Sequence, residues 1–318
     1  MTTPKHVVKS LRDAETRFLH GFNEAGKKDL FAGLVHIVTD ATGKVSFPIL
    51  TRQPSFQKLV GQITPEGLDA ATYSIEADPY IAAMDIPLSE LKRGIATVGG
   101  GSYMRLFQGM GEQIIHSKNK VMTAFLEANG NDVLGSAFFG NSGAIPNSKG
   151  AITLDNLDGV TGTSAANMQA DMDDIIDLML ATQNSAGDYV HTDAMIAPKT
   201  VMVPAALATA AWEAFEKADG SAAETNKFKK YNISVVVNPY LASGTAWYVF
   251  LSGGLYPPLV LLQEQLAPEL RNNAGGVNGA LSGDWVEQAV QLTDKVTLSA
   301  RHPYTVGWGN RSYAFKTA

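Results

Sequence analysis

The stretch YMRLFQGMGEQIIHSKNKVMTAFLEA, residues 103–128, decides the fold because it predicts one long helix. Large apolar side chains recur in it at helical spacing, which places them in a narrow stripe along one face. Ser102 is suited to cap the N-terminus of this helix, and Asn129-Gly130 is suited to end it. At about 1.5 Å per residue the helix would be roughly 39 Å long. The stripe consists of Leu106, Met110, Ile114, Val121 and Phe125.

Upstream of this helix, the pattern is typical of strands separated by turns. Residues 35–85 are interpreted as a long two-stranded excursion with an irregular tip. A two-stranded hairpin is only marginally stable in water by itself, so we expect the excursion to pack on a partner. Gly99-Gly100-Gly101 lacks the spacing of a phosphate-binding loop and is interpreted as a tight turn or hinge. Strands are predicted at residues 34–38, 45–50, 71–76 and 80–86.

Downstream of the long helix, the chain predicts a loop-rich segment at 138–162, a second helix and then a mixed region of strands and helices. The second helix begins after Thr163 or Ser164 and ends near Thr182. Pro204 opens a further helix over residues 205–217. The predicted class is therefore α+β. The remaining strands are predicted at residues 200–203, 233–237, 246–251, 259–262, 285–300 and 306–315.

The composition limits the classes of function. Hydrophobic residues make up 45 % of the chain, which is enough for a packed core. Charged residues make up only 18 %, and the net charge of −6 argues against a dedicated nucleic-acid-binding protein. The absence of cysteine excludes disulfides and thiol catalysis. Neither a signal peptide nor a transmembrane helix is expected, because no apolar run is long enough.

One acidic cluster is the candidate metal site that the sequence offers. Asp173, Asp174 and Asp177 share a face of the second predicted helix, and Asp171 lies one turn away. A solvated acidic face explains the same pattern, and we favour that interpretation. The histidines show no metal-binding spacing, and no nucleophile–base motif is present. No catalytic, cofactor-binding or metal-binding residue is therefore predicted.

The order of the predicted elements resembles the major capsid fold of tailed bacteriophages, which encapsulin shells and the herpesvirus capsid floor share. It is most similar to the major head protein of Mu-like phages, from about residue 30 to the end. The similarity is carried by several segments in the same order. They are 71–76 (ATYSIE), 84–91 (MDIPLSEL), 201–207 (VMVPAAL), 247–250 (WYVF), 257–263 (PPLVLLQ), 267–269 (APE), 300–301 (AR) and 306–309 (VGWG).

This resemblance implies a division of the chain into domains. The extended loop would reach over a neighbouring subunit, so Arg52, Phe56 and Lys58 in the loop are predicted inter-subunit contacts. Phe18 and Phe22 in the N-terminal arm are predicted to contact a neighbour as well. The parts are the arm 1–34, the extended loop 35–85, the peripheral domain 86–190 with its spine helix 103–128, the axial domain 191–284, the returning peripheral-domain strand 285–305 and the C-terminal axial-domain segment 306–318.

The resemblance also implies a function, that of a structural major capsid protein and not an enzyme. The protein would self-assemble into pentamers and hexamers of an icosahedral phage head that encloses double-stranded DNA. Its partners would be further copies of itself, separate scaffolding and portal proteins, decoration proteins in some phages, and the packaged DNA without sequence-specific contact. Assembly would take place in the host cytoplasm, the mature location would be the virion capsid, and no cofactor or membrane is involved.

Two alternatives remain open at this point. An encapsulin-like nanocompartment shell would use the same fold to enclose a cargo enzyme in place of DNA. A soluble metal-dependent α/β enzyme would use the acidic helix as its metal site, and it would need residues 35–85 to pack on its own body. A second cluster of metal ligands would favour the enzyme, and the sequence contains none.

Overall fold

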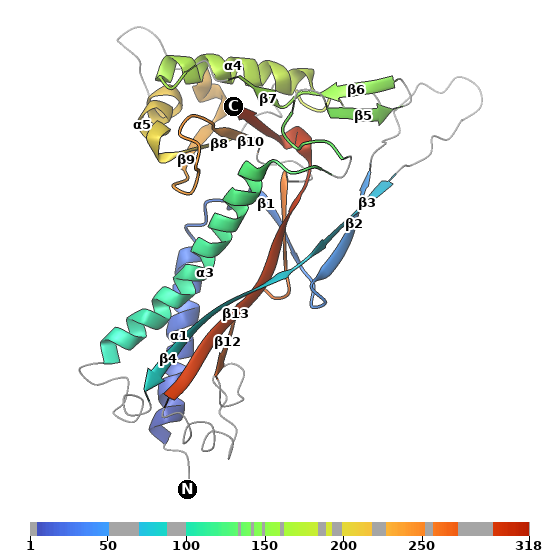
Figure 1. Ribbon diagram of the computed structural model, residues 1–318. Coiled ribbons are helices and arrows are strands. Elements are labelled where there is room, and N and C mark those ends of the chain that lie inside the picture. The colour runs from blue at the N-terminus through green and yellow to red at the C-terminus, as the bar shows by residue number, and fades with distance from the viewer. Residues whose placement is uncertain are drawn as a thin grey trace.

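One long helix and one long strand organise the lower part of the molecule (Figure 1). α3 (Gly100–Ala128) has 29 residues and confirms the helix predicted over residues 103–128, while β13 (Lys295–Trp308) has 14 residues. This computed structural model describes residues 5–50, 70–87, 100–132, 135–140, 143–147, 150–159, 162–183, 189–192, 199–217, 227–251, 257–272 and 295–317.

The N-terminal helix α1 (Lys5–Gly26) packs along α3, and the two helices cross at a pair of glycines (Figure 1). A Cβ atom on Gly21 would overlap the carbonyl oxygen of Gln108, and a Cβ atom on Gly111 would overlap that of Phe18. The two backbones can touch here only because neither glycine carries a side chain. The segment predicted to be an arm is thus helical over residues 5–26 and packs on its own subunit.

The lower part contains a five-stranded sheet built around β13. β4 (Asp78–Pro87) pairs antiparallel along one edge of β13. β11 (Leu259–Gln263) and β12 (Glu269–Asn272) pair with successive parts of the other edge. They therefore form one strand that residues 264–268 interrupt. β1 (Val35–Thr39) completes the sheet by pairing parallel with β11.

Of the two faces of this sheet, the described helices cover one. Along β13, Val296, Leu298 and Ala300 are buried against the helices, whereas the residues between them are partly exposed. On the open face, Ile81 of β4 is 65 % exposed. This alternation is the pattern of a half-buried antiparallel sheet. The helix side of the core adds Ala14, Phe18, Phe107 and Ile114.

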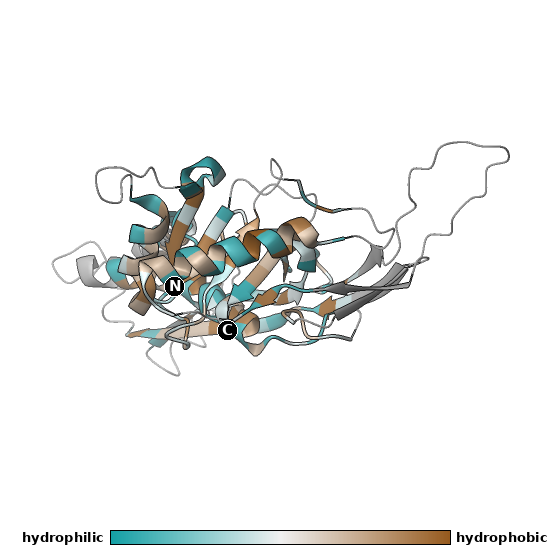
Figure 2. Cartoon of the chain, turned by 90° about the horizontal axis from the view of Figure 1, so that it is seen from above, coloured by the Kyte–Doolittle hydropathy of each residue, from teal (hydrophilic) through white to brown (hydrophobic). Residues whose placement is uncertain are grey.

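The upper lobe contains a second five-stranded sheet, in the order β7-β14-β10-β8-β9. α4 (Ala165–Ala181) packs against it, and in the view from above α4 carries both hydrophobic and hydrophilic residues (Figure 2). The Ser164 Oγ accepts the N–H of Asn167 at 3.3 Å, which confirms the predicted cap. The strands are β7 (Leu157–Asp158), β8 (Lys199–Val203), β9 (Ile233–Val237), β10 (Tyr248–Leu251) and β14 (Ala314–Thr317).

The remaining elements are two β-ribbons and several short helices. β2 (Lys44–Leu50) pairs with β3 (Ala70–Glu76), and β5 (Gly143–Asn147) pairs with β6 (Gly150–Leu154). The short helices are η1 (Ala205–Leu207), α5 (Ala208–Ala211), η2 (Trp212–Glu216), η3 (Lys227–Tyr231) and η4 (Arg311–Tyr313).

The excursion predicted over residues 35–85 is shorter in the structure. Only β2 and β3 form the two-stranded ribbon, because β1 pairs with β11 and β4 pairs with β13 in the sheet of the body. The sequence marks all four segments as short strands, but such a local pattern does not specify which strands pair. The tip, residues 51–69, lies outside the described residues.

Other boundaries also differ from the sequence predictions. The helix predicted over 205–217 is divided into a 3-10 turn, an α-helical turn and a π-helical turn. The strand predicted over 306–315 is wrong, because β13 continues to Trp308 and a 3-10 turn separates it from β14. Within the predicted loop 138–162, residues 143–147 and 150–154 form the β5–β6 ribbon. Gly100 and Gly101 begin α3, while residues 88–99 and 273–294 lie outside the described residues.

Candidate functional site

The β2–β3 ribbon projects away from the body of the molecule (Figure 1). Its register runs from Lys44 opposite Glu76 to Leu50 opposite Ala70. Among the described strands, β2 and β3 pair only with each other. Its base carries an exposed ion pair, Lys44 to Glu76 at 3.0 Å, which contributes little stability. The ribbon is therefore a candidate surface for contact with another molecule.

The joint between the ribbon and the body is a tight turn. Gly43 has a φ of 67°, and its carbonyl oxygen accepts the N–H of Ala77 at 2.8 Å. The Asp40 carboxylate accepts a hydrogen bond from the Thr42 hydroxyl and another from the Thr42 N–H at 2.8 Å, and these two bonds lower the pKa of Asp40. Ala77 alone separates β3 from β4, so one nearly continuous strand runs from the ribbon into the body sheet.

The structure places only some of the residues predicted to contact a neighbour. Arg52, Phe56 and Lys58 lie outside the described residues. Phe18 is completely buried between α1 and the sheet, so its side chain is used inside the subunit. Phe22 is half-buried, and its ring lies against His302 and Lys118. An inter-subunit contact by Phe22 stays a prediction.

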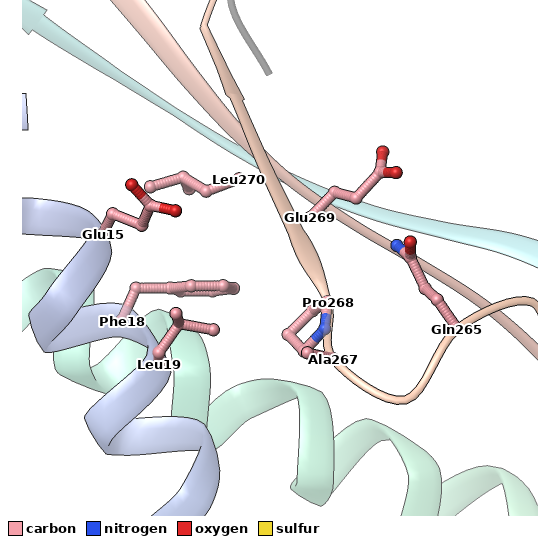
Figure 3. A pocket seen from close by; sticks show the side chains of 8 residues that line it. All are labelled: Glu15, Phe18, Leu19, Gln265, Ala267, Pro268, Glu269 and Leu270. Atoms are coloured by element: carbon pink, nitrogen blue, oxygen red, sulfur yellow. The ribbon is translucent and has the colours of Figure 1, made fainter. Parts of the chain in front are cut away.

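A cavity of about 280 Å³ separates α1 from the segment between β11 and β12 (Figure 3). Phe18, Leu19 and Leu270 form its apolar wall. Two carboxylates, those of Glu15 and Glu269, lie at its rim, and that of Glu269 accepts a 2.5 Å hydrogen bond from Arg271. The lining contains no nucleophile–base pair, so this cavity has the character of a packing surface.

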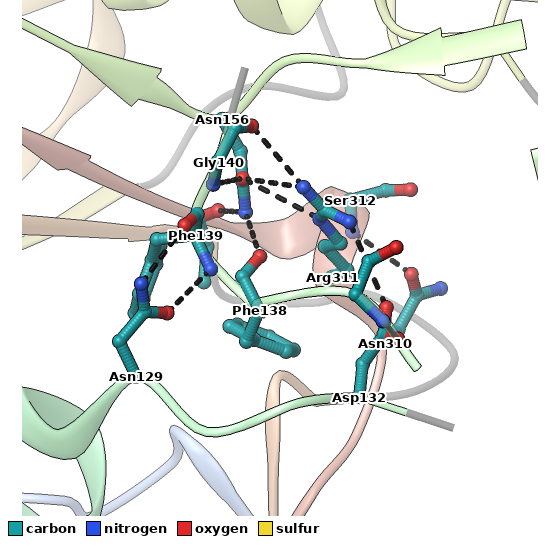
Figure 4. Close-up of polar contacts among 11 residues, drawn as sticks. Asn129, Asp132, Phe138, Phe139, Gly140, Asn156, Asn310, Arg311 and Ser312 are labelled. Carbon is teal, nitrogen blue, oxygen red and sulfur yellow. Dashed lines mark hydrogen bonds and ion pairs between the residues drawn. The ribbon is translucent and has the colours of Figure 1, made fainter. Parts of the chain in front are cut away.

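A buried polar network ties α3 to the end of the chain (Figure 4). The Arg311 Nη2 donates to the Gly140 carbonyl oxygen at 3.1 Å and to the Asn156 Oδ1 at 3.4 Å. The Arg311 Nη1 lies 3.7 Å from the Asp132 Oδ2. The Asn156 amide in turn donates to the carbonyl oxygens of Phe138 and Ala314. The network joins the segments after α3, before β7 and before β14, and sequence reasoning missed it.

The acidic cluster on α4 is divided by the fold. Asp171 is completely buried, whereas Asp173 is partly exposed and forms an ion pair with Lys227 of η3. Within the described ranges, no group of three or more His, Cys, Asp or Glu side chains is placed to hold a metal ion. In the same ranges, no helix is both long enough and apolar enough to cross a membrane.

The tryptophans that the structure describes in the C-terminal third, Trp247 and Trp308, are core residues. Both are buried, and the Trp308 ring stacks on Phe138 at a centroid distance of 4.1 Å. The ring of Phe125 of α3 also contacts Trp308, at a centroid distance of 4.3 Å. Trp308 therefore packs the end of the long strand β13 against the long helix α3. Its burial also helps to join the lower part of the molecule to the upper lobe.

Known proteins identify the fold. The model of the phage capsid protein family matches residues 96–317. No curated protein matches the sequence. The fold is similar to that of the virus-like particle from Pyrococcus furiosus, with a TM-score of 0.54 and 11 % identity over 95 % of this chain and 96 % of that one. The mature capsid of bacteriophage PhiM1 is similar with a TM-score of 0.57 and 11 % sequence identity, and the capsid of cyanophage P-SCSP1u with a TM-score of 0.56 and 10 % sequence identity. Each comparison covers 90 % of this chain and 86 % of the other.

The family match covers well over half of the chain, including α3, the upper sheet, β11, β12 and β13 of the lower sheet, and the Arg311 network, whereas β1 and β4 precede it. The solved structures are too distant in sequence to show more than the fold, and they agree with the predicted α+β capsid fold. The Mu-like relationship stays a prediction. The chain belongs to the phage capsid protein family, and it is a structural protein of a viral capsid rather than an enzyme.

Proposed function

We propose that this protein is the major subunit of an icosahedral phage head and that it assembles with itself into pentamers and hexamers around double-stranded DNA. The β2–β3 ribbon carries this proposal, because it pairs with no other described strand and leaves the body of the molecule. A ribbon of two strands gains stability when something packs on it. A neighbouring copy supplies that surface in a closed shell.

The domains receive their roles from the observed elements. The lower part, with α3 and the sheet around β13, acts as the peripheral domain, and the upper lobe acts as the axial domain near the symmetry axes. These bounds differ from the predicted 86–190 and 191–284, because α4 packs on the upper sheet while β11 and β12 pair with β13. The part that reaches over a neighbour is the ribbon with its tip, residues 44–76, rather than all of 35–85. Arg52, Phe56 and Lys58 lie within it and make the contact with the neighbouring subunit.

The other proposed partners follow from the role of a head subunit. Scaffolding and portal proteins take part in assembly in the host cytoplasm, and decoration proteins bind the finished shell in some phages. The net charge of −6 suits a container for DNA, because an acidic wall does not hold a polyanion tightly. The mature protein resides in the virion capsid.

Removal of the tip tests the proposal. Deletion of residues 52–67 should leave a folded body, with an unchanged helix content by circular dichroism, yet abolish closed shells in electron micrographs. The triple variant Arg52→Ala, Phe56→Ala, Lys58→Ala should weaken assembly, whereas Arg52→Lys, Phe56→Tyr, Lys58→Arg should retain it. Normal shells from the deletion variant would show that the ribbon tip has no role in assembly.

A second candidate function is an encapsulin-like shell that encloses a cargo protein. It is favoured by one observation, the similarity in fold to a virus-like particle over nearly the full length of both chains. Shells isolated from the native host separate the two functions. Nuclease-resistant DNA of uniform length inside the shells supports the phage head, and a single co-purifying enzyme without DNA supports the nanocompartment.

A further inference from the structure

A lysine and a histidine are buried next to each other beneath α1. Lys118 of α3 is 5 % exposed, and His302 of β13 is 1 % exposed. The Lys118 Nζ donates a hydrogen bond to the Gln263 Oε1 at 3.0 Å. Neither ring nitrogen of His302 has a hydrogen-bond partner within the described residues. A buried polar group without a partner opposes burial, so this pair works against the packing that covers it.

The surroundings of the pair are aromatic and offer little compensation. The Phe22 ring of α1 lies 6.0 Å from the His302 ring and 5.7 Å from the Lys118 Nζ. The Tyr304 ring lies 5.8 Å from the His302 ring, and Tyr80 of β4 stacks on Tyr304. Such rings tolerate an ammonium group, but they offer no acceptor to an imidazolium.

The charged groups around the pair come from each element packed against it. Asp29, in the segment after α1, partly balances Lys118, but its carboxylate already accepts the Phe31 N–H at 3.0 Å. Tyr80 and Tyr304 are neutral near pH 7, since the ordinary pKa of tyrosine is about 10 and burial raises that of both side chains further, that of Tyr304 to about 12. For His302, burial and then the nearby Lys118 charge lower the pKa to about 3.

We propose that α1 is an acid-releasable cover, which leaves α3 when His302 takes up a proton and so exposes the Lys118–His302 pair. The geometry supports a local opening. α1 is at the N-terminal end of the chain and packs chiefly on α3, and the ring of Phe22 contributes to the cover over both groups. Release therefore exposes the pair while the upper lobe, with its separate core, stays folded.

The direction of the pH effect follows from the histidine. In the released state His302 has its ordinary pKa of about 6.5, whereas in the covered state it is about 3. The covered state thus binds the proton more weakly than the released state. The stability of the covered state is therefore highest above pH 6.5 and decreases as the pH falls below that value. Between pH 7.5 and pH 5 the ratio of covered to released molecules should fall roughly 30-fold.

The chain contains no cysteine, so one introduced thiol can report this opening. Ala14 lies in α1 and is completely buried against the rest of the subunit, and Ala314 lies in β14 of the upper sheet and is also completely buried. Ala14→Cys and Ala314→Cys would each be made in the full-length chain, in the same oligomeric state. Labelling with dithiodipyridine, relative to the same variant in denaturant, gives the protection of each thiol at pH 7.5 and pH 5.

The proposal expects a roughly 30-fold loss of protection at position 14, less than a threefold loss at position 314, and no pH dependence at position 14 once His302→Leu is added. An equal loss at both positions would mean global unfolding, and it would overturn the proposal. Constant protection at position 14, or a loss that survives in His302→Leu, would overturn it too. Should His302→Leu fail to fold, His302→Gln serves with the same criteria.

Discussion

The crossing of α1 and α3 allows a prediction in which one substitution has opposite effects at two positions of the same helix. Gly109 and Gly111 both lie in α3. A Cβ atom on Gly109 would meet nothing within 4 Å, whereas a Cβ atom on Gly111 would overlap backbone atoms of Phe18 and Phe22 in α1. Gly109→Ala therefore tests helix propensity alone, and Gly111→Ala adds the overlap with α1.

The expected magnitudes follow from these surroundings. Gly109→Ala should stabilise the protein by about 0.5–1 kcal/mol, because alanine is the better helix former. Gly111→Ala has the same gain in helix propensity, but the overlap of its Cβ atom with α1 should cost about 1–3 kcal/mol of stability. The cost is high because backbone atoms cannot move aside as a flexible side chain can. The free energies of unfolding of the two variants should thus differ by about 1–3 kcal/mol. Gly21→Ala, on the other side of the crossing, should resemble Gly111→Ala.

The assay is urea unfolding of the full-length chain, followed by circular dichroism. The double variant Gly21→Ala, Gly111→Ala provides a further check. Helices already separated by the first alanine make room for the second, so the two losses should sum to more than the loss of the double variant. If Gly111→Ala were as stable as Gly109→Ala, α1 would not lie on the spine helix of its own subunit as the structure has it.

Two further predictions concern buried charge. Arg311→Ala removes the guanidinium from the Asp132 carboxylate and the Asn156 Oδ1, and thermal unfolding should show a loss of stability of about 2–3 kcal/mol. Arg311→Lys should not restore this stability, because an ammonium group cannot make the same set of hydrogen bonds. A loss below about 0.5 kcal/mol in Arg311→Ala would contradict the role of the network. For Lys118, burial lowers the pKa to about 8 from 10.5 despite the nearby Asp29, so the unfolded chain holds this proton more tightly. The free energy of unfolding should rise by on the order of 2 kcal/mol between pH 8 and pH 10, and Lys118→Met should remove that rise.

The elements with a regular period were predictable from the sequence. α3 and α4 form at the predicted positions, and the caps agree to within a few residues. The stripe predicted for α3 matches its buried face only in part, however, because Leu106 is 52 % exposed while Phe107, Met122 and Leu126 are buried. Strands such as β9 and β11 were found because alternation or a short apolar run marks them. These signals are local in the sequence, so they identify a helix or strand even when the element on which it packs is not known.

Pairing partners were not predictable, because they are set by contacts between distant residues. β1 was assigned to the excursion, yet it pairs with β11, more than 200 residues further along the chain. Arg311 is part of a sequence that looks like an ordinary surface turn, and only the fold brings Asp132 and Asn156 to it. Phe18 was predicted to face a neighbour, but the glycine crossing that buries it has no signature in a single sequence.

The continuity of β3 and β4 links the ribbon to the rest of the subunit. Residues 70–87 pair first with β2 in the ribbon and then with β13 in the body, and only Ala77 lies between. A strand in two sheets cannot slip by one residue in either without moving its inward side chains outward. A force applied to the ribbon by a neighbouring copy would therefore act on the seam of β4 and β13. β13 ends at Trp308, which packs against α3 and Phe138, so the strain would reach the joint between the two regions. If a neighbouring copy packs on the ribbon as we propose, its contact there would therefore act on the centre of the subunit.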